Sequence, residues 1–191
     1  MEACPLRKSV LDCDGHVLVL GGPGSGKTTI ALRKAIRRIS AGVAPGQKVL
    51  FLSFTKAAVA RVADAAKIEA PKGQREGLNL QTFHSFFWEI LCSHAYLLGV
   101  KKRLQILMPQ DERVLSEGIK EDKDPEKWAA WMAERARLFR EEGRIAFELF
   151  GPNAAQLLTK SEHLRGLVAQ RYPLIIVDEA QDTWPDAWRC I

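Results

Sequence analysis

The stretch Gly21–Thr28, with the sequence GGPGSGKT, constrains the fold more than any other part of the chain. It fits the pattern GxxxxGK followed by Ser or Thr, and it lies between an apolar run and a helical pattern, as this motif requires. Glycines let successive backbone N–H groups converge on phosphate oxygens, and the N-terminus of the following helix adds a positive end. Lys27 would reach the terminal phosphates, and the Thr28 hydroxyl would bind Mg²⁺. The stretch therefore predicts a site for a nucleoside triphosphate.

Apolar runs and helical patterns alternate through the first half of the chain. We expect buried strands at 16–20, 48–54 and 78–82. We expect helices after them, at 29–40, 56–68 and 83–99. Such alternation predicts an α/β fold in which helices flank a parallel sheet. Residues 69–77, EAPKGQREG, are polar and contain Pro and Gly, so we expect a loop there.

The pattern becomes mostly helical from about residue 101 to residue 170. Residues 124–143 are amphipathic, with Asp124 as a candidate N-cap and Pro125 at the first helical position. A further helix is expected at 151–172. The large apolar residues of the first helix are expected to be core residues: Trp128, Trp131, Met132 and Leu138. The simplest interpretation is a mostly helical insertion of about 70 residues.

A strand that ends in acids follows this helical region. Four aliphatic residues, Leu174–Val177, lead directly into Asp178 and Glu179. An acid at this place would hold Mg²⁺ through water, and we assign that role to Asp178. Glu179 would act as a general base that orients the attacking water. The two acids are expected to complete the triphosphate site.

Four motifs in this order resemble those of the superfamily 1 DNA helicases of the UvrD/Rep type. They are GGPGSGKT, LSFTKAA at Leu52–Ala58, TFHSF at Thr82–Phe86 and DEAQD at Asp178–Asp182, which Thr183 follows. The gap of roughly 90 residues between the last two is similar to the helical insertion of that family. The resemblance implies a P-loop NTPase fold: the first RecA-like domain, at 1–98 and 171–191 and incomplete at its C-terminus, with an inserted helical subdomain at 99–170.

The resemblance also implies roles for individual residues. ATP would be bound by Gly22, Gly24, Ser25, Gly26, Lys27, Thr28 and Thr29. Thr28 and Asp178 would hold Mg²⁺, and catalysis would depend on Lys27, Glu179 and Gln181, the last of which would link the nucleotide to the DNA-binding elements. Single-stranded DNA would lie near Phe54, Thr55, Lys56, Thr82, Phe83, His84 and Ser85. Aromatic rings can stack on bases, and hydroxyl and imidazole groups can bond phosphates, although Phe54 and Phe83 judged alone would be core residues.

Two departures from the family's pattern matter. The glutamine that reads adenine in the family falls on Leu6 here, and leucine cannot make the paired hydrogen bonds of an amide, so the choice between ATP and GTP stays open. The family's second RecA-like domain, which supplies arginines to the transferring phosphate, would follow Ile191. Loss of such an arginine costs about 10³–10⁵ in turnover. We therefore expect that this chain binds nucleotide, hydrolyses it poorly and unwinds nothing alone.

Composition and charge narrow the class of protein. The chain has 191 residues, of which 47% are hydrophobic and 27% charged, and no apolar run is long enough to span a membrane. We expect a cytoplasmic protein without a signal peptide, with its four cysteines as reduced thiols. Residues 15–63 hold eight Lys or Arg residues and no Asp or Glu, within a net charge of +5. This bias favours an anionic ligand such as phosphate or nucleic acid, although a solvated basic helix face would give the same pattern.

Two other classes of function stay open. A small P-loop kinase would carry a lid of arginines, for which Arg135, Arg137 and Arg140 could serve, yet nearby glutamates indicate a solvated helix face. A non-catalytic nucleotide- or DNA-binding module would act through a partner. The face that would meet the second domain could also invite self-association, and its candidate exposed residues are Phe150, Trp184 and Trp188.

Overall fold

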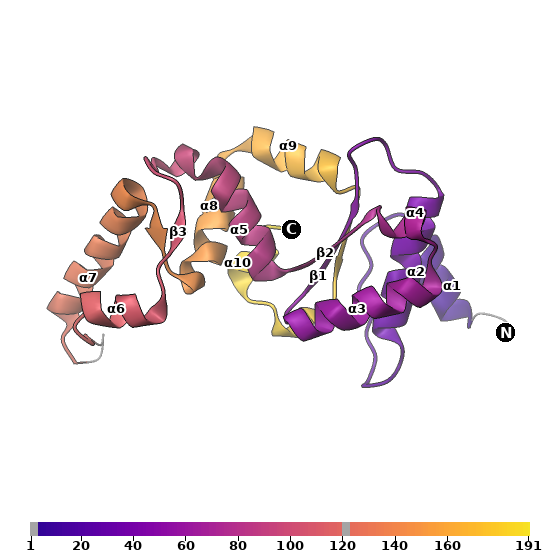
Figure 1. The fold of residues 1–191 in the computed structure, drawn as a ribbon. Coiled ribbons are helices and arrows are strands. Elements are labelled where there is room, and N and C mark those ends of the chain that lie inside the picture. Colours follow the sequence, from indigo (N-terminus) through magenta and orange to yellow (C-terminus); the bar gives the residue numbers. More distant parts are fainter. Residues whose placement is uncertain (1–3, 120–122) are drawn as a thin grey trace. The chain divides into compact units, whose positions relative to one another are not determined.

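The computed structural model describes residues 4–119 and 123–191 (Figure 1). These residues divide into two compact units. Unit 1 consists of the chain up to Phe83 together with Arg165–Thr183. Unit 2 consists of His84–Leu164 together with Trp184–Ile191. The domain limits expected from the sequence lie elsewhere, after residues 98 and 170, and stay a prediction.

Unit 1 contains a parallel sheet of three strands in the order β2-β1-β5. The strands are β1 (Val49–Ser53), β2 (Leu78–Thr82) and β5 (Leu174–Val177). Phe51 of β1 pairs with Leu80 of β2 on one side and with Ile176 of β5 on the other. All five residues of β1 are buried, as an almost wholly apolar run in a central parallel strand should be. The sequence prediction of a parallel sheet is confirmed for these three runs.

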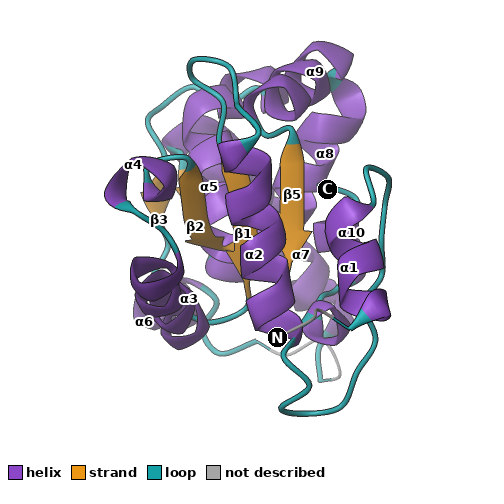
Figure 2. Ribbon diagram, turned by 90° about the vertical axis from the view of Figure 1, so that its right-hand side faces the viewer, coloured by secondary structure: helices purple, strands orange, loops and turns teal. Residues whose placement is uncertain are grey.

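The helices of unit 1 supply the other half of its core. They are α1 (Pro5–Asp12), α2 (Lys27–Ser40), α3 (Lys56–Glu69) and α4 (Lys72–Arg75). α2 crosses one face of the sheet (Figure 2). Its Leu32 and the α3 residue Val62 pack with Phe51 in one buried cluster. The helices expected at 29–40 and 56–68 are therefore confirmed, whereas α1 was not expected and α4 lies within the expected loop.

The strand expected at 16–20 is wrong. This segment joins α1 to the loop before α2, and it pairs with no strand in the described part of the chain. Leu18 and Leu20 are 72% and 83% exposed. An apolar run becomes a buried strand only where a neighbouring strand offers its backbone groups, and no such ladder forms here. Instead, the Lys34 Nζ donates to the carbonyl oxygens of Val10 and Cys13, at 2.8 and 2.5 Å, and holds the end of α1 against α2.

Unit 2 is mostly helical, as expected for the middle of the chain. Its α-helices are α5 (Phe83–His94), α6 (Pro109–Leu115), α7 (Pro125–Arg137), α8 (Phe150–Lys160) and α10 (Pro185–Trp188), while α9 (Glu162–Arg171) leads toward β5. Short helical turns join them: η1 (Ala95–Leu98), η2 (Leu138–Glu142) and η3 (Phe147–Leu149). A two-residue parallel pair, β3 (Gln105–Ile106) with β4 (Arg144–Ile145), was not expected.

The two long helices expected in this region both differ from the prediction, the first at its C-terminal end and the second in its middle. α7 begins as predicted, with the Asp124 carboxylate accepting a hydrogen bond from the backbone N–H of Lys127 at 3.2 Å. It ends in the π-helical turn η2, after which Gly143 adopts a φ of 73° that favours glycine. The single helix expected at 151–172 is two helices. They are separated at Ser161, whose Oγ accepts from the backbone N–H of Leu164 at 3.2 Å.

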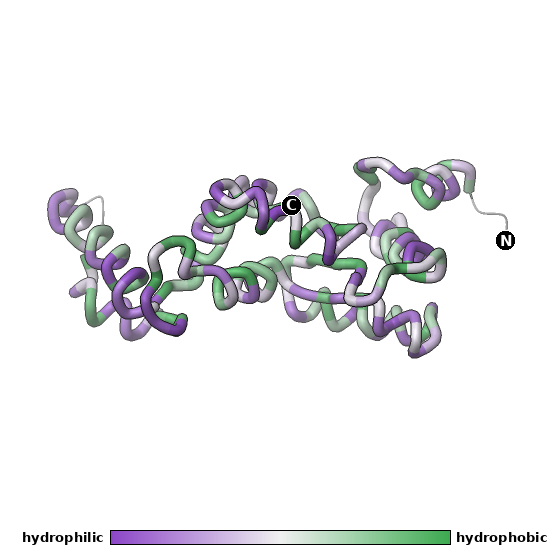
Figure 3. Tube along the Cα trace, turned by 90° about the horizontal axis from the view of Figure 1, so that it is seen from above, coloured by the Kyte–Doolittle hydropathy of each residue, from purple (hydrophilic) through white to green (hydrophobic). Residues whose placement is uncertain are grey.

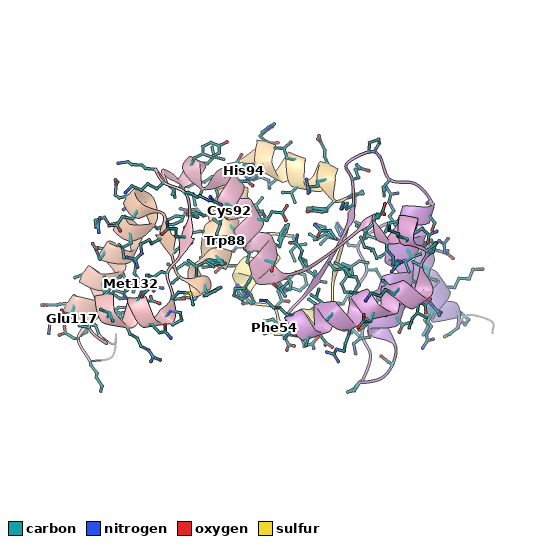
Figure 4. All side chains as sticks on the ribbon, viewed as in Figure 1. Phe54, Trp88, Cys92, His94, Glu117 and Met132 are labelled. Atoms are coloured by element: carbon teal, nitrogen blue, oxygen red, sulfur yellow. The ribbon has the colours of Figure 1, made fainter. Side chains whose placement is uncertain are left out.

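The core of unit 2 contains most of the residues predicted for it. Trp131 and Leu138 are buried in one cluster, and Trp128 and Met132 pack against it. Figure 4 labels Met132 on α7. Phe150 is only 1% exposed, and its ring stacks on that of Trp88 with 5.0 Å between centroids. The expectation that Phe150 belongs to an exposed apolar face is therefore wrong. Burial of this large ring in the core of unit 2 is more favourable than its exposure to water would be.

Hydrophilic and hydrophobic residues are mixed along the helices (Figure 3). Among the described residues, no helix combines the length and the apolar character that a membrane span requires.

Candidate functional site

The glycine-rich stretch Gly21–Thr28, called here the glycine loop, leads into the first turn of α2, which begins at Lys27. Gly24 and Gly26 have φ values of 73° and 83°, which residues with a side chain rarely adopt. Gly26 is the N-cap of α2, so the unpaired N–H groups of the first helical turn face the loop. The Lys27 Nζ folds back and donates to the carbonyl oxygens of Gly21 and Gly22, at 2.8 and 3.1 Å. The loop thus brings backbone N–H groups and one ammonium group together.

Three other residues expected at the nucleotide, Gly22, Ser25 and Thr29, are exposed in or beside this loop. Sequence reasoning missed a fourth residue, Arg7 of α1. Its Nη2 donates to the carbonyl oxygen of Ser25 at 3.1 Å. A side chain at Gly26 would meet the same Nη2 at 3.4 Å. The only signal of a role for Arg7 in the sequence was its position next to Leu6, which takes the place of the family's adenine-reading glutamine. Leu6 is itself 76% exposed.

The structure brings Thr28 and Asp178 together from positions 150 residues apart. The Thr28 Oγ1 donates to the Asp178 carboxylate, at 3.0 Å to Oδ2 and 3.3 Å to Oδ1. Asp178 is only 9% exposed, and its backbone N–H donates to the carbonyl oxygen of Leu52 at 2.9 Å, which continues the β1–β5 ladder. A buried carboxylate needs partners of this kind. The order of the sheet therefore places an acid beside the first turn of α2.

Glu179 follows in an unusual backbone conformation. Its φ is 54°, in the left-handed region that few residues other than glycine occupy. The short helical turn η4 (Ala180–Asp182) begins after it. The Gln181 Nε2 donates to the Glu179 Oε2 at 2.6 Å, so the two side chains are linked. Strained conformations of this kind gather at functional sites, which makes Glu179 a candidate on structural grounds as well.

Five of the residues expected near DNA, Phe54, Thr55, Lys56, Thr82 and Phe83, belong to unit 1. Phe54 follows β1 and lies beside the start of α3, where Figure 4 labels it. Its exposed fraction is 43%. Lys56 is exposed, and the Thr55 Oγ1 caps α3 by accepting from the backbone N–H of Ala58 at 3.1 Å. Thr82 and Phe83, at the end of β2, are 9% and 1% exposed. The expectation for Phe83 is therefore corrected: its ring is a core group and cannot stack on a base.

His84 and Ser85 belong to unit 2, on the first turn of α5. The His84 ring lies against the ring of Trp184, with 5.4 Å between centroids, and near that of Phe150 at 6.4 Å. Burial among these rings lowers the pKa of His84 below its ordinary value. Ser85 is exposed. A neutral His84 could offer a phosphate a hydrogen bond without a charge.

The mixed α/β architecture, with its parallel sheet and many helices, is consistent with a RecA-like helicase domain. The family described as UvrD/REP helicase N-terminal domain matches residues 5–141. The chain belongs to this family.

Several curated proteins are similar to it. A protein of Desulforudis audaxviator, described as one subunit of an ATP-dependent helicase/nuclease, is 26% identical over 202 residues, covering 95% of this chain and 15% of the relative. The protein of the same description from Enterococcus faecalis is 24% identical over 160 residues, covering 74% of this chain and 12% of the relative. A probable DNA helicase II homolog of Rickettsia conorii is 31% identical over 120 residues, covering 62% of this chain and 18% of the relative. The chain thus spans less than a fifth of the length of each of these relatives.

Proposed function

We propose that this chain is the ATP-binding N-terminal part of a UvrD/Rep-like DNA helicase. The observation that carries the proposal is the hydrogen bond between Thr28, at the end of the glycine loop, and Asp178, at the end of β5. It joins a loop suited to phosphate with an acid suited to a metal ion. The description of the relatives as ATP-dependent helicases supports the same nucleotide.

The loop would bind the phosphates through its backbone. The N–H groups at the start of α2 would donate to phosphate oxygens, and the positive end of the helix would favour the negative charge. Lys27 now donates to the carbonyl oxygens of Gly21 and Gly22. On binding, the ammonium group would exchange these acceptors for the more negative oxygens of the terminal phosphates. Before ATP binds, Lys27 would therefore stabilise the glycine loop through these two hydrogen bonds, which the phosphates would then replace.

Thr28 and Asp178 fit Mg²⁺ in their chemistry, because both offer oxygen atoms. Among the residues that the structure describes, no group of three or more His, Cys, Asp or Glu side chains could hold a metal ion. The Thr28 hydroxyl would bind the ion, Asp178 would hold it through water, and phosphate oxygens of ATP and further water molecules would complete its shell. Bound Mg²⁺ would neutralise charge on the phosphates. Glu179, oriented by Gln181, would take a proton from the attacking water.

Full activity is proposed only for a longer protein. The chain covers 12–18% of the relatives described above, and arginines that stabilise the transferring phosphate would come from a second RecA-like domain. DNA would contact unit 1 through the exposed Phe54 and Lys56, by stacking and by charge. The kinase alternative gains no support, because Arg137 is paired with Glu134 and Glu142 on its own surface.

A titration with a fluorescent ATP analogue and Mg²⁺ tests the proposal. We expect saturable binding by the wild type and its loss in Lys27→Ala. Lys72→Ala, which removes an exposed lysine of α4, is the matched control and should bind like the wild type. Unlabelled ATP, GTP and ADP as competitors measure the base preference that Leu6 leaves open. A folded wild type that does not bind, or equal binding by Lys27→Ala, would contradict the proposal.

A further inference from the structure

Unit 2 contains a pocket of about 330 Å³ that the proposed function does not use. It lies between α7 with its π-helical turn η2 and α8, and Leu98 of η1 closes one side. Met132 and Phe139 form part of its apolar wall, and Asn153 and Gln156 add two amide groups. This size and this mixture of an apolar wall with a few polar groups are typical of sites for small ligands.

Arg135 is the unusual member of the lining. Its side chain is 9% exposed, although charged side chains are rarely buried unless fully paired. The Nη2 contacts the carboxylates of Glu112, at 3.0 Å, and of Glu148. Among the residues that the structure describes, the Nη1 has only the Met132 Sδ as an acceptor, at 3.8 Å, which is a weak partner. The Nε is buried and has no hydrogen-bond partner among the described residues.

A donor on a charged group that has only a sulfur acceptor is costly to bury, so the Arg135 Nη1, which contacts the lining residue Met132, is placed to donate to an added oxygen. The arginine fork is suited to planar or tetrahedral oxyanions. Its two carboxylate partners do not line the pocket, and they occupy the Nη2 alone. Neither the Nε nor the Nη1 has an oxygen acceptor among the described residues; the Nε is fully buried, whereas the Nη1 contacts Met132 of the pocket wall.

Two further cations, Arg140 and Lys160, line the same pocket. Both are exposed, and neither forms an ion pair within the described part of the chain. No Asp or Glu residue contributes to the lining. Glu112 and Glu148 already compensate the charge of Arg135, so Arg140 and Lys160 supply the positive charge beside the apolar wall, a pattern that attracts an anion with an apolar body.

We propose that this pocket binds an oxyanion, phosphate or carboxylate, that is attached to an aromatic or short aliphatic group. Arg135 would donate from its Nη1 to the oxyanion, Arg140 and Lys160 would neutralise its charge, and Met132 and Phe139 would contact the apolar part. Such a group occurs on free metabolites and at a phosphorylated end of a nucleic acid strand. The site lies wholly within unit 2 and is independent of the glycine loop.

The test is a calorimetric titration of the whole chain with phenyl phosphate and, separately, phenylacetate. Arg135→Lys keeps the charge beside Glu112 and Glu148 but removes the Nη1 donor of the guanidinium fork, and it should weaken binding by about tenfold or more. The double variant Arg140→Ala/Lys160→Ala changes only exposed residues and should weaken binding to a similar degree. Arg113→Ala/Lys123→Ala removes the same charge from exposed positions outside the pocket and should bind like the wild type.

Two further arms separate the sources of the ligand. Inorganic phosphate should bind more weakly than phenyl phosphate, because it lacks the apolar body. A 5′-phosphorylated oligothymidylate that competes with phenyl phosphate would identify a strand end as the source, and failure to compete would leave free metabolites. Lys27→Ala should bind phenyl phosphate normally, so loss of the nucleotide site would not affect this result. No saturable binding by the folded wild type, or equal binding by wild type, Arg135→Lys and Arg140→Ala/Lys160→Ala, would overturn the proposal.

Discussion

Replacing Thr28 by valine tests the contact on which the candidate nucleotide site depends. Valine keeps the shape of the side chain but removes the Oγ1 that donates to Asp178 at 3.0 Å. The Asp178 carboxylate is 9% exposed and would lose this donor without gaining full access to water. A hydrogen bond to a charged group contributes about 1.5–3 kcal/mol. We therefore expect Thr28→Val to lower the free energy of unfolding by about that amount in the absence of nucleotide.

A double-mutant cycle isolates the contact itself. Asp178→Asn should also destabilise unit 1, and the double variant should cost less than the sum of the two, with a coupling energy of about 0.5–3 kcal/mol. Thr29→Val, an exposed neighbour with the same change of chemistry, is the control and should stay within about 0.5 kcal/mol of the wild type.

The assay must report on unit 1. The five tryptophans all lie in unit 2, so their emission would follow the wrong part of the chain. Urea unfolding followed by circular dichroism, together with hydrogen exchange of peptides from β1, reports on the sheet. Additive effects of Thr28→Val and Asp178→Asn, with Thr28→Val no worse than Thr29→Val, would refute the reasoning.

Three further predictions concern the core, a thiol and a histidine. Phe51→Ala empties the centre of the sheet, where Phe51 is 1% exposed, and should cost about 3–5 kcal/mol by hydrogen exchange of β1, whereas Phe54→Ala at a 43% exposed position should cost far less. All four cysteines are free, and burial raises the pKa of Cys190 to about 12. A thiol reagent at pH 8 should therefore label Cys4, Cys13 and Cys92 in the native chain and Cys190 only after unfolding. Four labelled thiols without denaturant would contradict the packing of α10. Because burial lowers the pKa of His84, the unfolded chain takes up a proton at this residue before the folded chain does, so stability should fall as the pH falls below about 6.5. The urea midpoint of His84→Gln, followed by tryptophan emission, should depend less on pH than that of the wild type. An unchanged dependence would exclude this role for His84.

The sequence predicted the structure correctly where a local pattern of residues decides it. The runs that became β1 and β5 are continuous and almost wholly apolar, and each pairs with another strand of the sheet, so their patterns predicted strands correctly. The start of α7 was equally local, because an N-cap and a proline act within one turn. A glycine conformation such as that of Gly26 is also set locally by its neighbours in the loop.

Long-range packing explains what the sequence could not predict. The run at 16–20 has the composition of a buried strand, yet no described strand pairs with it and Leu20 is 83% exposed. Phe83 could be a stacking platform or a core ring by its motif, and only the packed structure placed it in the core. Arg135 seemed to belong to a solvated helix face, because its position beside Glu134 gave no sign of Glu112 and Glu148 from other elements.

The central claim is that the glycine loop and Asp178 together form a site for ATP and Mg²⁺. The most direct test is a calorimetric titration of the chain with ATP, once with Mg²⁺ and once with a chelator, in the wild type and in Asp178→Asn. The account predicts that Mg²⁺ tightens ATP binding by the wild type and has little effect on the variant, since Asp178 would hold the metal ion. Equal tightening by Mg²⁺ in both proteins, or no binding of ATP by the folded wild type, would contradict it.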